Sequence, residues 1–85
     1  MSKLMAFSVH DQAAAAFLRP FFTKTRGQAV RGFSDAVNDA KHEFHAHPED
    51  YTLFYIGEFD EDKGELKASV PESLGNALTF MESEK

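Results

Sequence analysis

The chain contains no cysteine and no tryptophan among its 85 residues. The lack of cysteine excludes a disulfide scaffold, a thiolate nucleophile and any zinc or iron–sulfur site with sulfur ligands. No run of about 18 apolar residues occurs, which argues against a transmembrane helix, and the first residues lack the basic and then apolar pattern of a secretory signal. We therefore expect a protein that stays in the cytoplasm and does not enter a membrane.

Positive charge is scarce, and it is unevenly distributed along the chain. The formal net charge is −5, with +3 in residues 1–42 and −8 in residues 43–85. An acidic protein repels nucleic acid at long range, so nucleic-acid binding would have to use a local basic surface from the first half. The alternative for the acidic half is an ordinary solvated surface that keeps a phenylalanine-rich domain soluble.

One domain, residues 1–85, is all that a chain of this length supports, because it buries only about 60–65% of its unfolded surface. Nine phenylalanines supply the bulk of the core, since each ring can bury ~150–250 Å². A domain this small commonly gains stability from a partner surface, so we expect a homodimer or another homo-oligomer.

The first half of the chain predicts two extended segments before its helix. Residues 4–10 alternate as a strand does, and the side expected to face the core carries Met5, Phe7 and Val9. Residues 17–23 are too aromatic for an exposed loop, but Pro20 has no backbone donor, which favours an edge strand or an extended crossover.

The second half predicts a hairpin. Residues 51–59 include four apolar residues in succession, as a strand covered on both faces requires. An acidic turn closes on Gly64, which is suited to positive φ. Residues 65–70 then alternate as a strand with one wet face, and we expect Pro71 to end it.

One amphipathic helix is predicted at about residues 25–38. Thr25 and Gln28 have the spacing of a capping box at its start, and Asn38 is a suitable residue for its end. An apolar stripe at three- and four-residue spacing comprises Ala29, Val30, Phe33, Ala36 and Val37. The expected fold is α+β, with a small antiparallel sheet of three or four strands packed against this helix.

The remaining segments are predicted to be less regular. Residues 39–50 form a polar connection in which Phe44 is the expected anchor to the core. Near the C-terminus, Gly75 weakens a short helical pattern, so we expect residues 76–85 to be a partly ordered, flexible tail.

Six segments in one order carry a family resemblance: PFF at 20–22, AVRGFSDAVND at 29–39, HPEDYTLF at 47–54, GEFD at 57–60, GEL at 64–66 and SLG at 73–75. Together they resemble the small nonstructural protein of gokushovirus-type microviruses, which are single-stranded DNA bacteriophages. The segments span nearly the whole chain. The alanine run at 13–16 and the histidines His42 and His45 depart from the family pattern.

The resemblance implies a protein made in the cytoplasm of the infected bacterial host and absent from the virion. It further implies an accessory role in synthesis of the viral single-stranded DNA genome, with viral replication proteins as partners. It supplies no catalytic residues. A competing hypothesis is a protein–protein adaptor that engages the replication initiator or a host factor through its acidic half without contacting DNA.

A candidate nucleic-acid site combines aromatic rings with nearby cations in the first half of the chain. A single-strand binder needs rings that stack on bases, at ~1–3 kcal/mol each, and cations that follow the phosphates. The candidate residues are Arg19, Lys24, Arg26, Arg31, Phe21 and Phe22. The alternative is that the two rings belong to the core, which is where phenylalanines usually lie.

A histidine-rich segment is a weaker candidate, for a metal site. His42, His45 and His47 lie close together with Glu43 and Glu49, and imidazole and carboxylate both bind zinc or nickel. Structural metal sites usually present four ligands at regular spacing, which this segment lacks, so a solvated loop is the alternative. We expect no metal and no other cofactor.

Catalytic chemistry finds no support in the sequence. The serines lack the context of a nucleophile elbow. The carboxylates between Glu58 and Asp62 fall in a turn, where water screens them, whereas general acid–base catalysis calls for buried carboxylates. We expect a protein that is not an enzyme.

Overall fold

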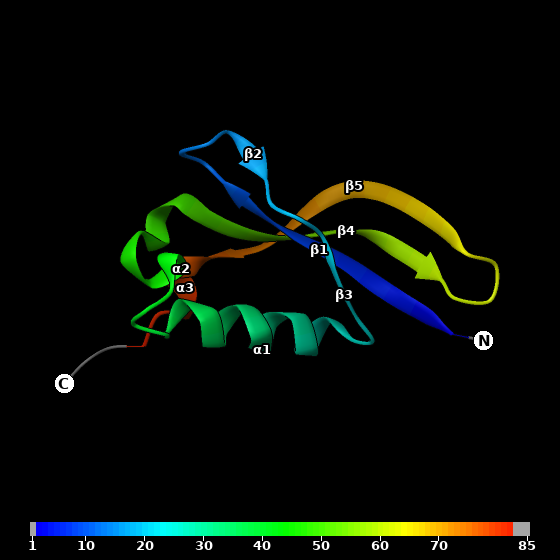
Figure 1. Ribbon diagram of the computed structural model, residues 1–85, viewed down its shortest axis with the longest axis horizontal. Helices are drawn as coiled ribbons and strands as arrows, with labels where there is room; N and C mark the ends of the chain where they lie inside the picture. Colours follow the sequence, from blue (N-terminus) through cyan, green and yellow to red (C-terminus); the bar gives the residue numbers. More distant parts are fainter. Residues whose placement is uncertain (1, 83–85) are drawn as a thin grey trace.

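The computed structural model describes residues 2–82. Within this range the chain forms, in order, β1 (Lys3–Asp11), β2 (Ala16–Phe17), β3 (Phe21–Thr23), α1 (Arg26–Val37), α2 (Glu43–Ala46), the 3₁₀-helix η1 (Pro48–Asp50), β4 (Tyr51–Asp60), β5 (Glu65–Asn76) and α3 (Ala77–Phe80). An antiparallel sheet and α1 make up the body of the molecule, and α2 and α3 lie near the C-terminal end of α1 (Figure 1). The α+β class is confirmed, but short helices accompany the single predicted one.

The sheet has the strand order β2-β1-β4-β5, and β3 also pairs with β1. Both β2 and β3 lie along the same edge of β1, β2 opposite residues 10–11 and β3 opposite residues 5–7. The linker between them, residues 18–20, bridges the middle of this edge, where the Ser8 hydroxyl donates a hydrogen bond of 2.6 Å to the Leu18 carbonyl. The predicted edge strand and crossover are therefore both present, and Pro20 falls where no ladder donor is needed.

Burial along β1 differs from the expected alternation. Phe7 and Val9 are buried as predicted, but Ala6 and Ser8 on the other side are also buried. The linker and the neighbouring strands cover these small side chains. Alternation alone could not predict this, because it assumes that only one face of the strand is covered.

The predicted hairpin forms from β4 and β5, and β4 is a central strand between β1 and β5. Gly64 in its turn has φ +67°. The prediction that Pro71 ends the second strand is wrong, because β5 continues to Asn76. Pro71 is tolerated because β5 is irregular there: the pairing jumps from Ala68 to Glu72.

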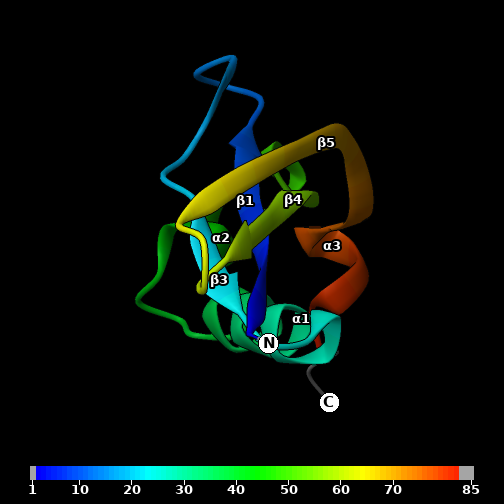
Figure 2. The same ribbon diagram turned by 90° about the vertical axis from the view of Figure 1, so that its right-hand side faces the viewer.

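This irregularity bends the sheet. On β4, Ile56 is skipped in the pairing with β1 and again in the pairing with β5. On β5, the three residues 69–71 stand opposite that one skipped residue. Extra residues of this kind strengthen the twist and bend the strand, and β5 turns a corner rather than running straight (Figure 2).

Helix α1 begins where the sequence predicts. The Thr25 hydroxyl accepts a hydrogen bond of 3.1 Å from the Gln28 N–H, which satisfies one of the free donors of the first turn. The Gln28 side chain accepts from the Lys24 N–H at 3.0 Å, one residue earlier than in a strict capping box. Asn38 is the C-cap, as expected.

The core lies between α1 and one face of the sheet. Ala29, Phe33 and Val37 are the buried residues of α1. They form one cluster with residues from the sheet and from α3, namely Phe7, Val9, Tyr51, Leu53 and Ala77. Phe44 packs against this cluster as predicted, but it lies in α2 rather than in an irregular connection.

The segment predicted to be a flexible tail packs onto the domain as far as residue 82. Ala77 is fully buried, and the Phe80 ring meets the Phe33 ring edge-on at 5.6 Å. The Asn38 side chain donates to the Phe80 carbonyl at 3.0 Å and accepts from the Glu82 N–H at 2.8 Å. Residues 83–85 of the predicted tail lie outside the described residues.

The molecule is elongated, with principal dimensions of 47 × 26 × 19 Å, because the β4–β5 hairpin extends beyond α1 (Figure 1). Among residues 2–82, no helix has the length and apolar character needed to cross a membrane. The predicted homodimer concerns contacts between chains and stays a prediction.

Candidate functional site

The sheet has two unlike faces. Paired residues of antiparallel strands place their side chains on the same face, so the register identifies the face that points away from α1. This surface, here called the open face, comprises Leu4, Ala6, Ser8, His10, Phe17, Phe22, Thr52, Phe54, Gly57, Phe59, Leu66, Ala68 and Ser73. None of these residues is Asp, Glu, Lys or Arg.

Aromatic rings form two groups on the open face. Near β2, the Phe17 ring lies 5.3 Å from Phe54 and 4.7 Å from His10, in both cases edge-on. Near β3, the Phe22 ring lies 6.0 Å from Phe59. Phe17 and Phe22 stay 47% and 41% exposed, so part of each ring remains free to contact another molecule.

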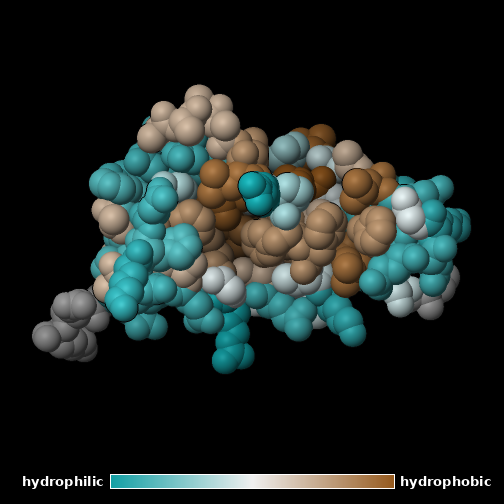
Figure 3. Space-filling view, in the orientation of Figure 1, coloured by the Kyte–Doolittle hydropathy of each residue, from teal (hydrophilic) through white to brown (hydrophobic). Residues whose placement is uncertain are grey.

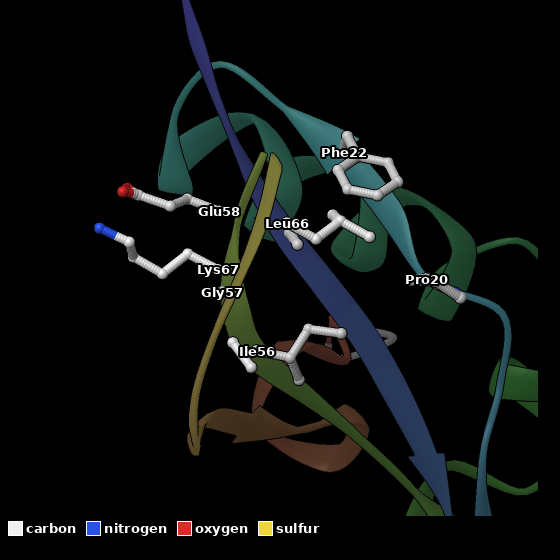
Figure 4. Close-up of a pocket in the computed structure, with 9 residues that line it drawn as sticks. Pro20, Phe22, Ile56, Gly57, Glu58, Leu66 and Lys67 are labelled. Carbon is white, nitrogen blue, oxygen red and sulfur yellow. The ribbon is translucent and has the colours of Figure 1, made fainter. Parts of the chain in front are cut away.

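A hollow of about 210 Å³ opens on this face. Most of the side chains that line it are apolar, namely Ala6, Pro20, Phe22, Ile56, Leu66 and Ala68. Glu58 and Lys67 also line it, but their charged ends point away from Phe22 and Leu66, to the other side of the sheet (Figure 4). Brown, hydrophobic surface gathers in the middle of the molecule above α1, and the lower rim and the right-hand end are mainly teal (Figure 3).

The bulged part of β4 shapes the hollow. Gly57 has φ +150°, and a Cβ atom at this position would lie 2.4 Å from the Lys67 carbonyl oxygen. Only glycine permits this backbone conformation together with so close an approach of β5. The hollow therefore depends on a residue without a side chain.

Two of the predicted cations flank the exposed Phe22 along the sheet edge. Arg19 lies in the linker before β3, and Lys24 follows β3 directly; both are exposed. They are five positions apart in extended chain, which corresponds to ~16 Å. Among residues 2–82, neither has a carboxylate within ion-pair distance.

Arg26 is placed differently. Its guanidinium group pairs with the Glu72 carboxylate of β5, at 3.2 and 3.4 Å for the two hydrogen bonds. It also lies over the Tyr55 ring, 5.6 Å from the centroid. These contacts attach the start of α1 to β5 on the core side, so the structure does not bring Arg26 to the open face.

Arg31 and Phe21 also fall outside the open face. Arg31 is exposed in the middle of α1, which packs on the opposite side of the sheet. The Phe21 ring stacks on the buried Phe7 at 5.8 Å and packs against the core cluster. Because neighbouring residues of a strand point to opposite faces, Phe21 is a core residue while its neighbour Phe22 is exposed.

The three histidines of the metal hypothesis take separate structural roles. The His42 ring accepts from the Phe44 N–H at 3.1 Å and so caps α2. The His45 ring lies 3.0 Å from the Val37 carbonyl oxygen, and His47 precedes η1. Within residues 2–82, no group of three or more histidine, aspartate or glutamate side chains is arranged to hold a metal ion.

Sequence reasoning missed Phe54, Phe59 and Leu66 as surface residues. The apolar run in β4 predicts a strand covered on both faces, but Phe54 and Phe59 are only half-buried, and Leu66 on the adjoining strand is 70% exposed. The one available signal was Gly57 in the middle of a predicted strand, because a strand glycine often marks a bulge or a close backbone approach.

Comparison with known proteins identifies the family. The family model of the phage ORF5 protein matches residues 4–80. The chain belongs to this family. It is also 33% identical to the Protein ORF5 of Chlamydia phage 1, over 92% of this chain and 88% of that protein. These matches confirm the resemblance to the small protein of gokushovirus-type microviruses. No solved structure matches the chain.

Proposed function

We propose that this phage ORF5 family protein binds single-stranded DNA and serves synthesis of the viral genome as an accessory protein without catalytic activity. The observation that carries the proposal is the open face, which presents exposed phenylalanine rings and no carboxylate. Two exposed cations, Arg19 and Lys24, lie along the β3 margin of that face. A viral single strand in the cytoplasm of the infected bacterium is the expected ligand.

The rings supply affinity that does not depend on base sequence. Every base has a flat face, and stacking on an aromatic ring contributes ~1–3 kcal/mol per base. Phe22 and Phe17 are the exposed rings nearest the sheet edge, at β3 and β2. A strand that follows this edge meets both rings, and Arg19 lies between them in the chain.

The net charge of −5 does not exclude such a contact, because salt screens exposed charges beyond ~8–10 Å. Many carboxylates lie in the β4–β5 turn and on the core side of β5. Glu61 of that turn lines a surface hollow together with Lys24, so we expect Arg19 to contribute more than Lys24. Only a few phosphates are contacted, and the affinity is therefore modest.

The test is a titration of labelled single-stranded DNA at several salt concentrations. Each neutralised phosphate contributes ~−0.7 to the slope of log affinity against log salt. An Arg19→Ala/Lys24→Ala variant is expected to flatten the slope by as much as ~1.4. The matched control is Arg31→Ala/Lys41→Ala, which removes the same charge from α1 and the loop after it and is expected to leave the slope unchanged.

Phe22→Leu separates stacking from electrostatics. It is expected to weaken binding by a factor of ~5 to ~160 through the lost stacking and to leave the salt slope unchanged. Absence of binding at low salt, or equal losses in both double variants, would refute the proposal.

An adaptor role is the second candidate. Residues 65–73 of β5 are all exposed, and Val70 among them is 86% exposed. An edge strand of this kind can pair with a strand of another protein, such as the replication initiator or a host factor. Binding of a basic viral or host protein with no affinity for DNA would favour this role.

A further inference from the structure

Nothing around the hollow on the open face indicates that it contributes to the stability of the fold. It is open to solvent on one side and lined by apolar side chains from β1, β3, β4 and β5. Leu66 at its rim is 70% exposed. Exposed apolar concavities of this kind are typical of places where another molecule binds.

We infer that the hollow takes one pyrimidine base, with thymine preferred, turned out of a DNA strand that follows the β2–β3 edge. This inference rests on the proposed function. The base stacks against Phe22 and places its C5 methyl group among Ile56, Leu66 and Ala68. Its polar edge stays at the open mouth, where water satisfies the hydrogen-bonding groups.

Size supports a single six-membered ring. An apolar cavity of about 150 Å³ holds a benzene molecule, and the hollow has about 210 Å³. The additional volume suits the carbonyl and methyl substituents of thymine. The two fused rings of a purine are larger, so we expect a purine to fit less well.

Charge favours a DNA strand over a second copy of the protein. Pro20 and Phe22, which line the hollow, belong to the same short segment as the exposed Arg19 and Lys24. Phosphates on either side of an inserted base meet these cations. A second copy that packed on the same face would instead bring its own Arg19 and Lys24 toward these cations.

The experiment compares oligonucleotides of thymidine and deoxyuridine, which share a backbone and differ by one methyl group per base. Burial of a methyl group is expected to make the thymidine oligonucleotide bind about fourfold more tightly. Ala68→Leu fills the hollow and is expected to abolish this difference while the salt slope stays unchanged. The control Ala40→Leu adds the same volume at an exposed position after α1 and is expected to keep the difference.

The outcomes separate this inference from the proposed function. Binding of both oligonucleotides with equal affinity would overturn the base site and leave DNA binding intact, whereas no binding of either would refute the proposed function. Sedimentation velocity tests whether a second copy occupies the hollow. If the wild type is a dimer and Ala68→Leu dissociates it, the hollow belongs to the dimer interface and the inference is overturned. Thermal unfolding of Ala68→Leu checks that the variant keeps its fold. Leu66→Ala removes one wall of the hollow and is a second variant that is expected to lose the preference for thymidine.

Discussion

Replacement of Gly57 by alanine tests the bulge that shapes both the sheet and its open face. The backbone at Gly57 has φ +150°, and an added Cβ would lie 2.4 Å from the Lys67 carbonyl oxygen and 3.2 Å from the Ala68 Cα atom. Backbone in such a region costs a residue with a side chain ~1–3 kcal/mol. The contact atoms belong to the β5 backbone, which cannot rotate away as a side chain does, so the overlap adds to that cost.

We expect Gly57→Ala to lower the free energy of unfolding by about 3 kcal/mol or more. A domain of this length has a total stability of ~4–13 kcal/mol, so the loss is a large fraction. With ~4–8 °C per kcal/mol for domains of this size, the melting temperature should fall by at least ~12 °C.

Gly32→Ala is the matched control with the opposite sign. Gly32 lies in α1, and nothing approaches within 4 Å of the position where its Cβ would be. Alanine is more favourable than glycine in a helix by ~0.8–1.0 kcal/mol. We therefore expect this variant to raise the melting temperature by ~3–8 °C.

Thermal and urea unfolding followed by circular dichroism measure both variants against the wild type. A Gly57→Ala protein that melts within a few degrees of the wild type would refute the reasoning. It would mean that β4 and β5 do not approach each other at the bulge as the structure shows.

Two further predictions concern stability. Asn38→Ala removes hydrogen bonds to the Ser34 and Phe80 carbonyls and from the Glu82 N–H. We expect the free energy of unfolding measured in urea to fall by ~1–3 kcal/mol and the amide hydrogens of α3 to exchange faster. Unchanged amide exchange in α3 would contradict this prediction. Burial raises the pKa of Tyr51, and the carboxylates of Asp11 and Glu43 add to the effect. The stability that the neutral Tyr51 side chain contributes is therefore fully present at pH values below its ordinary pKa of about 10, and it is lost as the pH rises through the higher pKa of the folded state. Urea unfolding between pH 9 and about 11.5 should show a steeper decline for the wild type than for Tyr51→Phe, and parallel curves would exclude this role.

The local elements of this protein are predictable because they rest on interactions between near neighbours in the chain. The cap formed by Thr25 and Gln28, the apolar stripe that follows it and the turn at Gly64 each lie within a few residues. The strands of residues 4–10 and 51–59 follow from patterns of the same kind. The family was also recognisable, because six short segments kept their order over nearly the whole chain.

The candidate site was predictable only in part. Arg19, Lys24 and Phe22 are exposed along one edge, and their role in binding DNA stays a prediction. Arg26 is not free, because its partner Glu72 lies 46 residues away in the sequence, and no local pattern predicts such a pairing. Phe21 and Phe22 are adjacent, so one of them had to face the core, and which one it was depended on the register of β3 with β1.

The amino-acid sequence by itself determined where the helix begins and ends, where the hairpin turns and how charge divides between the two halves, because short-range sterics, hydrogen bonding and composition decide these features. Only the tertiary structure decided which aromatic rings lie on the open face and that a hollow forms there. These depend on the bulge between β4 and β5. A shift of one residue in strand pairing moves every side chain beyond it to the opposite face, and the pairing is settled by packing across the whole sheet.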